Sequence, residues 1–288
     1  MGGRPARAQR RHEGDRARAR RALGGAGAHV SEPPRPRIAA AVICQDEEDR
    51  IAACLESVAW CDEIVVVDAG SRDRTALIAE KRATRVVRNA WPGYVAQKNF
   101  ALEQTTADWI LCLDADERCT PELADAIRRA LAGDPAVAGF AVRRHVFYLG
   151  RWIGHGGWYP DWKLRVVRRG RARWGGADPH DKLLSDGPVA RLDADLVHLT
   201  YRDFADHLRT VQRFSDVVSD AWLRAGRRPS LLRAALHPPV KFLECFVWKQ
   251  GFRDGWPGFV IAATSAFYVF AKHVKLWEKS RRPAPPPR

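Results

Sequence analysis

This 288-residue chain lacks the features that mark several classes of protein. Its six cysteines form no Cys-x-x-Cys pair and no spacing typical of a zinc site, so we expect reduced thiols. The last long apolar run, 259–271, is shorter than the roughly 20 residues of a membrane-spanning helix. No secretory apolar core lies near the N-terminus. A globular protein of a reducing compartment is therefore expected.

Acidic residues are scarce at the two ends of the chain. Overall, 48 Lys and Arg face 34 Asp and Glu, a formal charge of +14. Residues 1–37 hold ten Arg against three acids, and residues 279–288 hold four basic residues and no acid. The middle is nearly balanced, whereas a nucleic-acid-binding protein carries a basic stripe on a folded face. The composition disfavours a nucleic-acid partner, although a basic nucleic-acid-binding protein stays an alternative.

Short apolar runs alternate with helical patterns between these ends. Strands are expected at 38–44, 63–70, 84–89 and 108–116, and helices at 47–60, 71–83, 93–105, 120–133 and in two stretches around 202–225. Ser71 and Thr120 are expected to cap the helices that follow them, and Gly133 to end the helix before it. Continuous apolar strands between helices indicate an α/β protein with a parallel sheet covered on both faces.

Polar residues follow three of these strands. They are Gln45 to Glu48 after the first, Asp68 after the second, and Asp114 to Glu117 after the fourth. Because ligands of such sheets bind beyond the carboxyl ends of the strands, these residues predict a site at one edge.

The carboxylates in 114–117 admit four interpretations. A calcium-binding EF-hand loop is excluded, because Cys119 and Asp125 stand where Gly and Glu are needed. An aspartyl-phosphate phosphotransferase is disfavoured, because Arg118 stands where Thr is expected. A solvated turn before the next helix, with Glu117 serving that helix, is the simplest structural explanation. The fourth is a divalent metal that carries a diphosphate, because Mg²⁺ or Mn²⁺ prefers one or two carboxylates plus phosphate oxygens.

The surroundings favour the metal site. Asp68 precedes a tight turn at Gly70 and Ser71, where a carboxylate can accept a hydrogen bond from uracil and backbone amides favour an anion. Lys98 and Asn99 lie on the helix that leads to the Asp-x-Asp strand. A surface charge and a packing hydrogen bond, respectively, remain the alternatives for these two residues.

Residues 40–75 and 91–117, with "VVVDAGSRDRT" and "LDADE", resemble the N-terminal half of inverting family 2 glycosyltransferases. The resemblance is closest to the lipopolysaccharide core β-1,4-glucosyltransferase group, and continues less tightly through 156–169, 180–183, 197–202 and 251–278. It implies the GT-A fold, a Rossmann-like, mainly parallel sheet with helices on both faces, plus a C-terminal helical appendage. We expect a GT-A domain at 37–230 and a C-terminal helical segment at 231–280, for which membrane association is one interpretation. Composition alone, without a counterpart in the family, indicates a disordered Arg-rich arm (1–36) and a basic Pro-rich tail (281–288).

The resemblance also implies a reaction and its ligands. A hexose would pass from a UDP-sugar to a lipopolysaccharide-core or other glycolipid acceptor, by direct displacement with Mg²⁺ or Mn²⁺. Asp68 would contact the base, Asp114 the ribose or metal, and Asp116 the metal. Gln45 and Glu47 would flank the nucleotide. Transfer to a polyprenyl phosphate is an alternative, which would be expected to need longer spanning helices.

Further residues take roles by the same resemblance. The catalytic base would be Asp181, with Asp178 as the second choice, although the family more usually has Glu after this His. His198 would be a third metal ligand or a structural residue. Arg165 would face the diphosphate or lie exposed on its strand.

The acceptor side is expected to involve aromatic residues and a membrane. Trp158 and Tyr159 would stack on sugar faces or pack in the core, and Asp161 would bind sugar hydroxyls. The stretch 259–277, with Lys272, Lys275 and Trp277, fits an interfacial helix, or one packed on the domain or on a second subunit. We expect a cytoplasmic enzyme of cell-envelope biosynthesis, peripheral at the inner face of the cytoplasmic membrane.

Overall fold

The computed structural model describes residues 35–133, 135–177 and 180–281. The chain divides into two units, Met1–Arg35 and Pro36–Arg288, and every element below belongs to the second. The predicted Arg-rich arm and most of the Pro-rich tail lie outside the described residues, as does Asp178.

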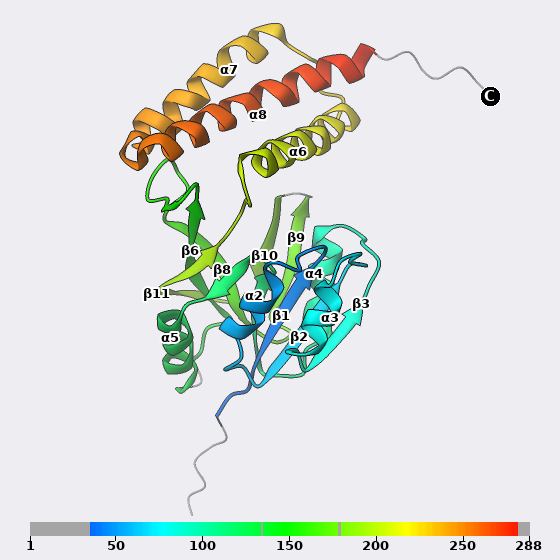
Figure 1. Ribbon diagram of the computed structural model, residues 1–288, viewed down its shortest axis with the longest axis vertical. Coiled ribbons are helices and arrows are strands. Elements are labelled where there is room, and N and C mark those ends of the chain that lie inside the picture. The colour runs from blue at the N-terminus through cyan, green and yellow to red at the C-terminus, as the bar shows by residue number, and fades with distance from the viewer. Residues whose placement is uncertain (1–34, 134, 178–179, 282–288) are drawn as a thin grey trace, which may run out of the picture. The chain divides into compact units, whose positions relative to one another are not determined.

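The first half forms the predicted α/β unit (Figure 1). Its strands are β1 (Ile38–Cys44), β2 (Glu63–Asp68), β3 (Arg85–Arg88) and β4 (Trp109–Asp114), and its helices are α2 (Ile51–Ser57), α3 (Thr75–Glu80), α4 (Tyr94–Glu103) and α5 (Pro121–Leu131). The four strands are parallel in the order β3-β2-β1-β4. Because β1 has neighbours reached by crossovers in opposite directions, a crevice is expected at its carboxyl end, between β1 and β4.

Helix boundaries differ from prediction where side chains serve the site instead. Thr120 caps α5 as expected, and its Oγ1 accepts a hydrogen bond from the Leu123 amide at 3.1 Å. Ser71 caps no helix, because its hydroxyl donates to Asp68 and α3 begins only at Thr75. The C-cap of α5 is Ala132 rather than Gly133.

The second half of the sheet is mixed rather than parallel. It contains β5 (Glu117–Cys119), β6 (Gly139–Tyr148), β7 (Arg151–Trp152), β8 (Asp161–Arg168) and β11 (Val189–His198), while β9 (Ala172–Ala177) and β10 (His180–Ser185) form a separate hairpin. Strand β8 runs antiparallel to both β4 and β6, and β11 runs parallel to β6. The connection from β6 to β8 contains the short strand β7 and no crossover helix, and β8 returns antiparallel to β6.

Both faces of the sheet are covered. Alternate residues of a strand point to opposite faces, and Ala40 and Val42 accordingly join the core cluster that includes residues of α2 and α5. Ala41 and Ile43 join the other cluster, which includes residues of α4 and the β9–β10 hairpin. This packing explains why the apolar strands show no polar alternation in the sequence.

A helical layer follows β11. Its elements are α6 (Phe204–Arg224), α7 (Leu231–Leu243), a π-helical turn η1 (Glu244–Trp248), a 3₁₀ turn η2 (Gly251–Asp254) and α8 (Gly255–Arg281). A single helix, α6, replaces the two stretches predicted around 202–225, and it begins at the N-cap Asp203. Helix α8 packs against both α6 and α7 (Figure 1).

Helix α8 is longer than the apolar run that marks it in the sequence. The stretch Gly251–Arg281 is long and apolar enough to cross a membrane by length and composition, and 44% of its most apolar window is buried within the protein. Lys275 and Lys279 lie on this helix and pair with Asp216 and Asp220 of α6 at 2.8 and 2.6 Å. These contacts make α8 the central helix of the helical layer.

Candidate active site

A cavity of about 1350 Å³ lies at the carboxyl ends of β1 and β4. The sheet supplies its floor, the β9–β10 hairpin one wall, and α6 contributes further lining residues. Ten of the thirteen predicted site residues line it: Gln45, Glu47, Lys98, Asp114, Asp116, Trp158, Asp161, Arg165, Asp181 and His198. Three do not: Asp68, Asn99 and Tyr159.

The carboxylate cluster after β4 is held by cations of the protein itself. Lys98 Nζ lies 3.0 Å from Asp114 Oδ1, and Arg165 Nη2 lies 3.4 Å from Asp114 Oδ2. Burial alone would raise the pKa of Asp114, but Lys98 and Arg165 outweigh it and hold that pKa well below its usual range. Asp114 is therefore a permanently ionised group with both oxygens engaged.

Glu117 has a role that sequence reasoning missed. It is fully buried, it accepts a hydrogen bond from the Asp114 amide at 3.1 Å, and it pairs with Arg165 at 2.5 Å. Burial would lower the pKa of Arg165, but Glu117 and Asp114 raise it, so the guanidinium stays charged. The prediction that Glu117 only serves the next helix is wrong, because the turn into β5 directs its side chain inward.

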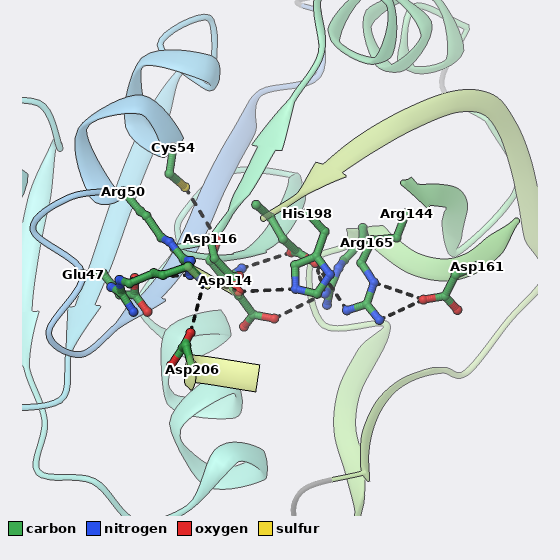
Figure 2. A network of polar contacts seen from close by, with 12 residues as sticks. Glu47, Arg50, Cys54, Asp114, Asp116, Arg144, Asp161, Arg165, His198 and Asp206 are labelled. Carbon is green, nitrogen blue, oxygen red and sulfur yellow. Dashed lines mark hydrogen bonds and ion pairs between the residues drawn. The ribbon is translucent and has the colours of Figure 1, made fainter. Parts of the chain in front are cut away.

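Asp116 and His198 meet although they are far apart in the sequence. Antiparallel pairing of β5 with β11 aligns His198 with Glu117, and brings His198 Nε2 to 3.3 Å from Asp116 Oδ2 (Figure 2). The other polar atom of each side chain, Asp116 Oδ1 and His198 Nδ1, is buried and has no hydrogen-bond partner among the described residues. A carboxylate and an imidazole that meet at a cavity, each with one atom that makes no hydrogen bond, are groups suited to a divalent metal.

The donor set for a metal is small. The described residues contain no group of three His, Cys, Asp or Glu arranged to hold an ion. Asp114, predicted as a ligand, is engaged by Lys98 and Arg165. The fit is therefore to an ion with two protein ligands, Asp116 and His198, whose other positions are filled by phosphate oxygens and water, as Mg²⁺ and Mn²⁺ accept.

Asp181 reaches the cluster from the β9–β10 hairpin. Its Oδ2 lies 2.9 Å from Lys98 Nζ, which also contacts Asp114, so the Asp181 side chain lines the cavity close to the end of β4. Burial would lower the pKa of Lys98, but Asp114 and Asp181 raise it above its ordinary value. Lys98 also lies over the Trp174 ring, 4.4 Å from its centroid, so one ammonium group ties α4, β4 and the hairpin together.

Asn99 anchors the hairpin rather than lining the cavity. Its amide donates to the Trp174 carbonyl at 3.0 Å and accepts from the Trp174 amide at 2.8 Å. Asn99 thus makes the packing hydrogen bonds that were the alternative to a nucleotide contact. Both its amide nitrogen and its amide oxygen bind the backbone of β9.

Asp68 lies beneath the turn that follows β2. Its carboxylate is 1% exposed and accepts hydrogen bonds from the amides of Gly70 and Ser71, each at 3.1 Å. Gly70 adopts a φ of 86°, which favours glycine in this tight turn. The carboxylate shapes the loop at the sheet edge, where its oxygens already accept hydrogen bonds from the protein. The predicted contact of Asp68 with a base stays a prediction.

Arg202 is a cavity residue that sequence reasoning did not single out. It donates to Glu47 Oε2 and to Asp49 Oδ1, both at 2.8 Å, and so ties the loop after β11 to the loop after β1. Burial raises the pKa of Glu47 to about 7, although Arg202 and Arg50 oppose this. The sequence did offer a signal for Arg202, because this residue lies four positions after His198 in the segment 197–202 that resembles the family.

The predicted acceptor residues separate into two groups. Trp158 lines the cavity and packs near Tyr201, and Asp161 lines it while pairing with Arg144 at 2.8 Å. Tyr159 lies away from the cavity, where its hydroxyl donates to Asp195 at 3.1 Å. Many further lining residues escaped prediction because nothing in their sequence surroundings marks them, among them Trp91, Tyr94, Arg213 and Phe214.

Comparisons with known proteins agree with this architecture. The model of glycosyl transferase family 2 matches residues 40–183, half of the chain. The lipopolysaccharide core biosynthesis glycosyltransferase LpsC of Rhizobium meliloti (strain 1021) is 29% identical over 265 residues, covering 88% of this chain and 96% of that protein. An uncharacterized glycosyltransferase of Rickettsia bellii (strain RML369-C) is 29% identical over 281 residues, covering 87% and 90%.

A solved structure shows the same fold. The mannosyltransferase PcManGT from Pyrobaculum calidifontis, in complex with GDP-Man and Mn²⁺, superposes with a TM-score of 0.50 at 17% identity, covering 94% of this chain and 97% of that one. The predicted GT-A fold is thereby confirmed. Together with the family match, these relationships show that the chain belongs to glycosyl transferase family 2 and is a glycosyltransferase related to those of lipopolysaccharide core biosynthesis.

Proposed function

We propose that this glycosyltransferase moves a hexose from a UDP-sugar to a lipopolysaccharide-core or other glycolipid acceptor, with inversion at the anomeric carbon. The observation that carries the proposal is the pair of Asp116 and His198, whose side chains meet at 3.3 Å and line the same cavity as Asp181. A metal-binding pair and a separate carboxylate at one cavity are the two elements that a single displacement requires.

The chain's own residues account for the donor side. Asp116 and His198 hold Mg²⁺ or Mn²⁺, and Arg165 and Lys98 supply fixed positive charge at the strand ends. When bound, the ion neutralises charge that develops on the leaving diphosphate. Gln45 and Glu47, on the loop after β1, flank the nucleotide.

Asp181 acts on the acceptor side. One carboxylate oxygen accepts the proton of the acceptor hydroxyl, whose oxygen forms the new bond to the anomeric carbon. The bond from that carbon to the diphosphate oxygen breaks on the opposite face, and the nucleoside diphosphate leaves with the electron pair. Lys98, 2.9 Å from Asp181, holds the carboxylate in position.

The acceptor is proposed to be attached to a lipid, and the enzyme to act in the cytoplasm as a peripheral protein of the inner membrane face. Support comes from the relationship to a lipopolysaccharide core glycosyltransferase and from the apolar helical layer next to the site. Within the proposal, residues 37–230 form the catalytic domain and residues 231–280 the membrane-associating segment.

A panel of UDP-sugars tests the proposal directly. Each donor is incubated with Mn²⁺ and a lipopolysaccharide-core acceptor, and the anomeric configuration of the product is read by proton NMR. A product of inverted configuration, formed from one UDP-hexose and lost when the metal is chelated, is expected. Retained configuration, or transfer only to a polyprenyl phosphate, would contradict the proposal.

A further inference from the structure

The end of the α7–α8 hairpin exposes large apolar side chains. We call residues 243–259 the hairpin tip; its exposed apolar residues are Leu243, Val247, Trp248, Phe252, Trp256 and Phe259. Trp248 and Trp256 are 67% and 71% exposed, and the Trp256 ring stacks on Phe259 with centroids 5.3 Å apart. A contiguous aromatic cluster of this size on a surface indicates a partner rather than a core.

Helix α7 extends this surface along its length. Leu232, Leu236, Val240 and Leu243 recur every three or four residues, which places them on one side of the helix, and all four are exposed. None of the residues of α7 is buried, although α7 packs along α8 (Figure 1). The apolar side of α7 therefore faces away from the protein.

The charges around this surface are basic. Helix α7 contains no acidic residue, and Arg233 and Arg253 are exposed. The two acids of the tip are not available to repel an anion, because Asp254 is 3% exposed and Glu244 pairs with Lys249 at 2.5 Å. Exposed tryptophan and phenylalanine bordered by Arg and Lys is the composition of a surface that enters the headgroup region of an anionic bilayer.

The tip is joined to the mouth of the cavity by buried hydrogen bonds. Asp254 accepts from the amides of Gly154 and His155 at 3.1 and 2.8 Å, and the Lys249 carbonyl accepts from the Gly156 amide at 2.8 Å. Trp158, two residues further along this loop, lines the cavity. Whatever surface holds the tip therefore also fixes the loop at the cavity mouth.

We infer that α7 and the hairpin tip dock on the surface of an anionic lipid bilayer, and so present the 154–158 loop to an acceptor embedded in that bilayer. The inference rests on the glycolipid acceptor proposed above and assigns the membrane contact to a definite surface. It replaces the predicted face with Lys272 and Lys275, because Lys275 pairs with Asp216 of α6 and Lys272 lies over Trp222. Docking is peripheral, because α8 keeps its ion pairs with α6.

Vesicle sedimentation of the full chain tests the docking surface. Wild-type protein is mixed with vesicles of phosphatidylcholine containing about 30% phosphatidylglycerol, at low salt and at about 1 M salt, where exposed charges are screened. The Trp248→Ser/Trp256→Ser variant is expected to bind at least about tenfold more weakly at high salt, where the basic ends of the chain contribute little. The Leu77→Ser/Val189→Ser variant, which alters two exposed apolar residues elsewhere, is the matched control and should bind like wild type.

Three results would overturn the inference. One is binding at high salt that is equal for the tip variant and wild type, while their melting temperatures agree. Another is a dimer of the wild type and a monomer of the tip variant in analytical ultracentrifugation, because the surface would then join two copies of the chain. The third is membrane association that resists alkaline carbonate, which would indicate a spanning helix.

The docking surface and the proposed function fail in different ways. If the tip variant loses vesicle binding but still transfers sugar to a detergent-solubilised acceptor, docking is supported and the site is intact. Vesicle binding without transfer to any acceptor would support the docking surface and contradict the proposed function. Transfer to vesicle-embedded acceptor that is unaffected by the tip variant would contradict docking alone.

Discussion

Lys98 Nζ lies 2.9 Å from Oδ2 of Asp181, and this contact joins helix α4 to the β9–β10 hairpin across 83 positions of the chain. The same ammonium group contacts Asp114 at the end of β4. One cation therefore holds two carboxylates that come from different elements of the fold, and its removal is expected to affect both binding and structure.

Replacing Lys98 with Met should be severely destabilising. Breaking a buried ion pair costs about 3–5 kcal/mol, and Lys98, which is only 8% exposed, pairs with both Asp114 and Asp181. Thermal unfolding should show this loss, and Lys98→Arg should restore most of it. The exposed Lys81→Met variant is the control. Wild-type stability in Lys98→Met would contradict the role assigned to the cluster.

Asp116→Asn and His198→Ala should each weaken Mn²⁺-dependent UDP binding by at least about tenfold, because each removes one of two proposed ligands. Calorimetric titration of UDP with and without Mn²⁺ measures the effect. Asp125→Asn, on the outer surface of α5, should bind normally. Unchanged metal dependence in both site variants would exclude this pair as the metal ligands.

Asp181→Asn should separate binding from chemistry. The amide cannot accept the proton of the acceptor hydroxyl, so kcat should fall at least about 100-fold, while UDP binding changes little. Asp181→Glu should keep measurable transfer, because it keeps a carboxylate at the same position. Full turnover by Asp181→Asn would show that another group is the base.

His207 should make the protein less stable at mildly acid pH. Burial beside Tyr148 lowers the pKa of His207 from 6.5 to about 4, and its Nδ1 lies 2.7 Å from the Tyr148 hydroxyl. The unfolded chain binds a proton near pH 6.5 and the folded chain only near pH 4. The contribution of His207 to the free energy of unfolding is therefore fully present above pH 6.5. It falls by about 3 kcal/mol as the pH drops to 4.

Urea unfolding of wild type and His207→Gln between pH 4 and 8 measures this effect. The difference between the two proteins should shrink as the pH falls. A constant difference across the range would contradict the assignment of the shift to His207.

Asp254→Asn should raise the KM for the acceptor more than it lowers kcat. The carboxylate holds the Gly154 and His155 amides, and a side-chain amide offers only one acceptor atom in its place. Hydrolysis of the donor without acceptor reports on the rest of the site and should be unchanged. An equal fall in hydrolysis and transfer would indicate general unfolding rather than loss of loop position.

Local sequence determined the first half of the molecule. Apolar runs such as 38–44 specify strands by length and composition, and Thr120 with Pro121 specifies a helix start, since both signals act over a few residues. The strand ends then located the cavity edge, because parallel strands joined by crossover helices place their carboxyl ends together.

Only the tertiary structure decided how the cluster is neutralised. The cluster of like charge in the sequence predicts that some positive group lies near Asp114 and Asp116. Arg165 reaches Asp114 through the pairing of β8 with β4, and Lys98 reaches it through the packing of α4. The meeting of Asp116 with His198 depends on the short β5 strand pairing with β11. Arg165 and Asp114 are 51 positions apart and Asp116 and His198 are 82 apart, and no local propensity encodes contacts over such separations.

The docking surface was also a tertiary outcome. The sequence does not distinguish which apolar residues of 231–277 face α6, another helix or solvent. Packing of α8 between α6 and α7 buried one set and left the tip, with Trp248 and Trp256, exposed. The sequence thus determined that this segment is apolar, helical and basic, and the packing of three helices decided which of its faces is free to contact a membrane.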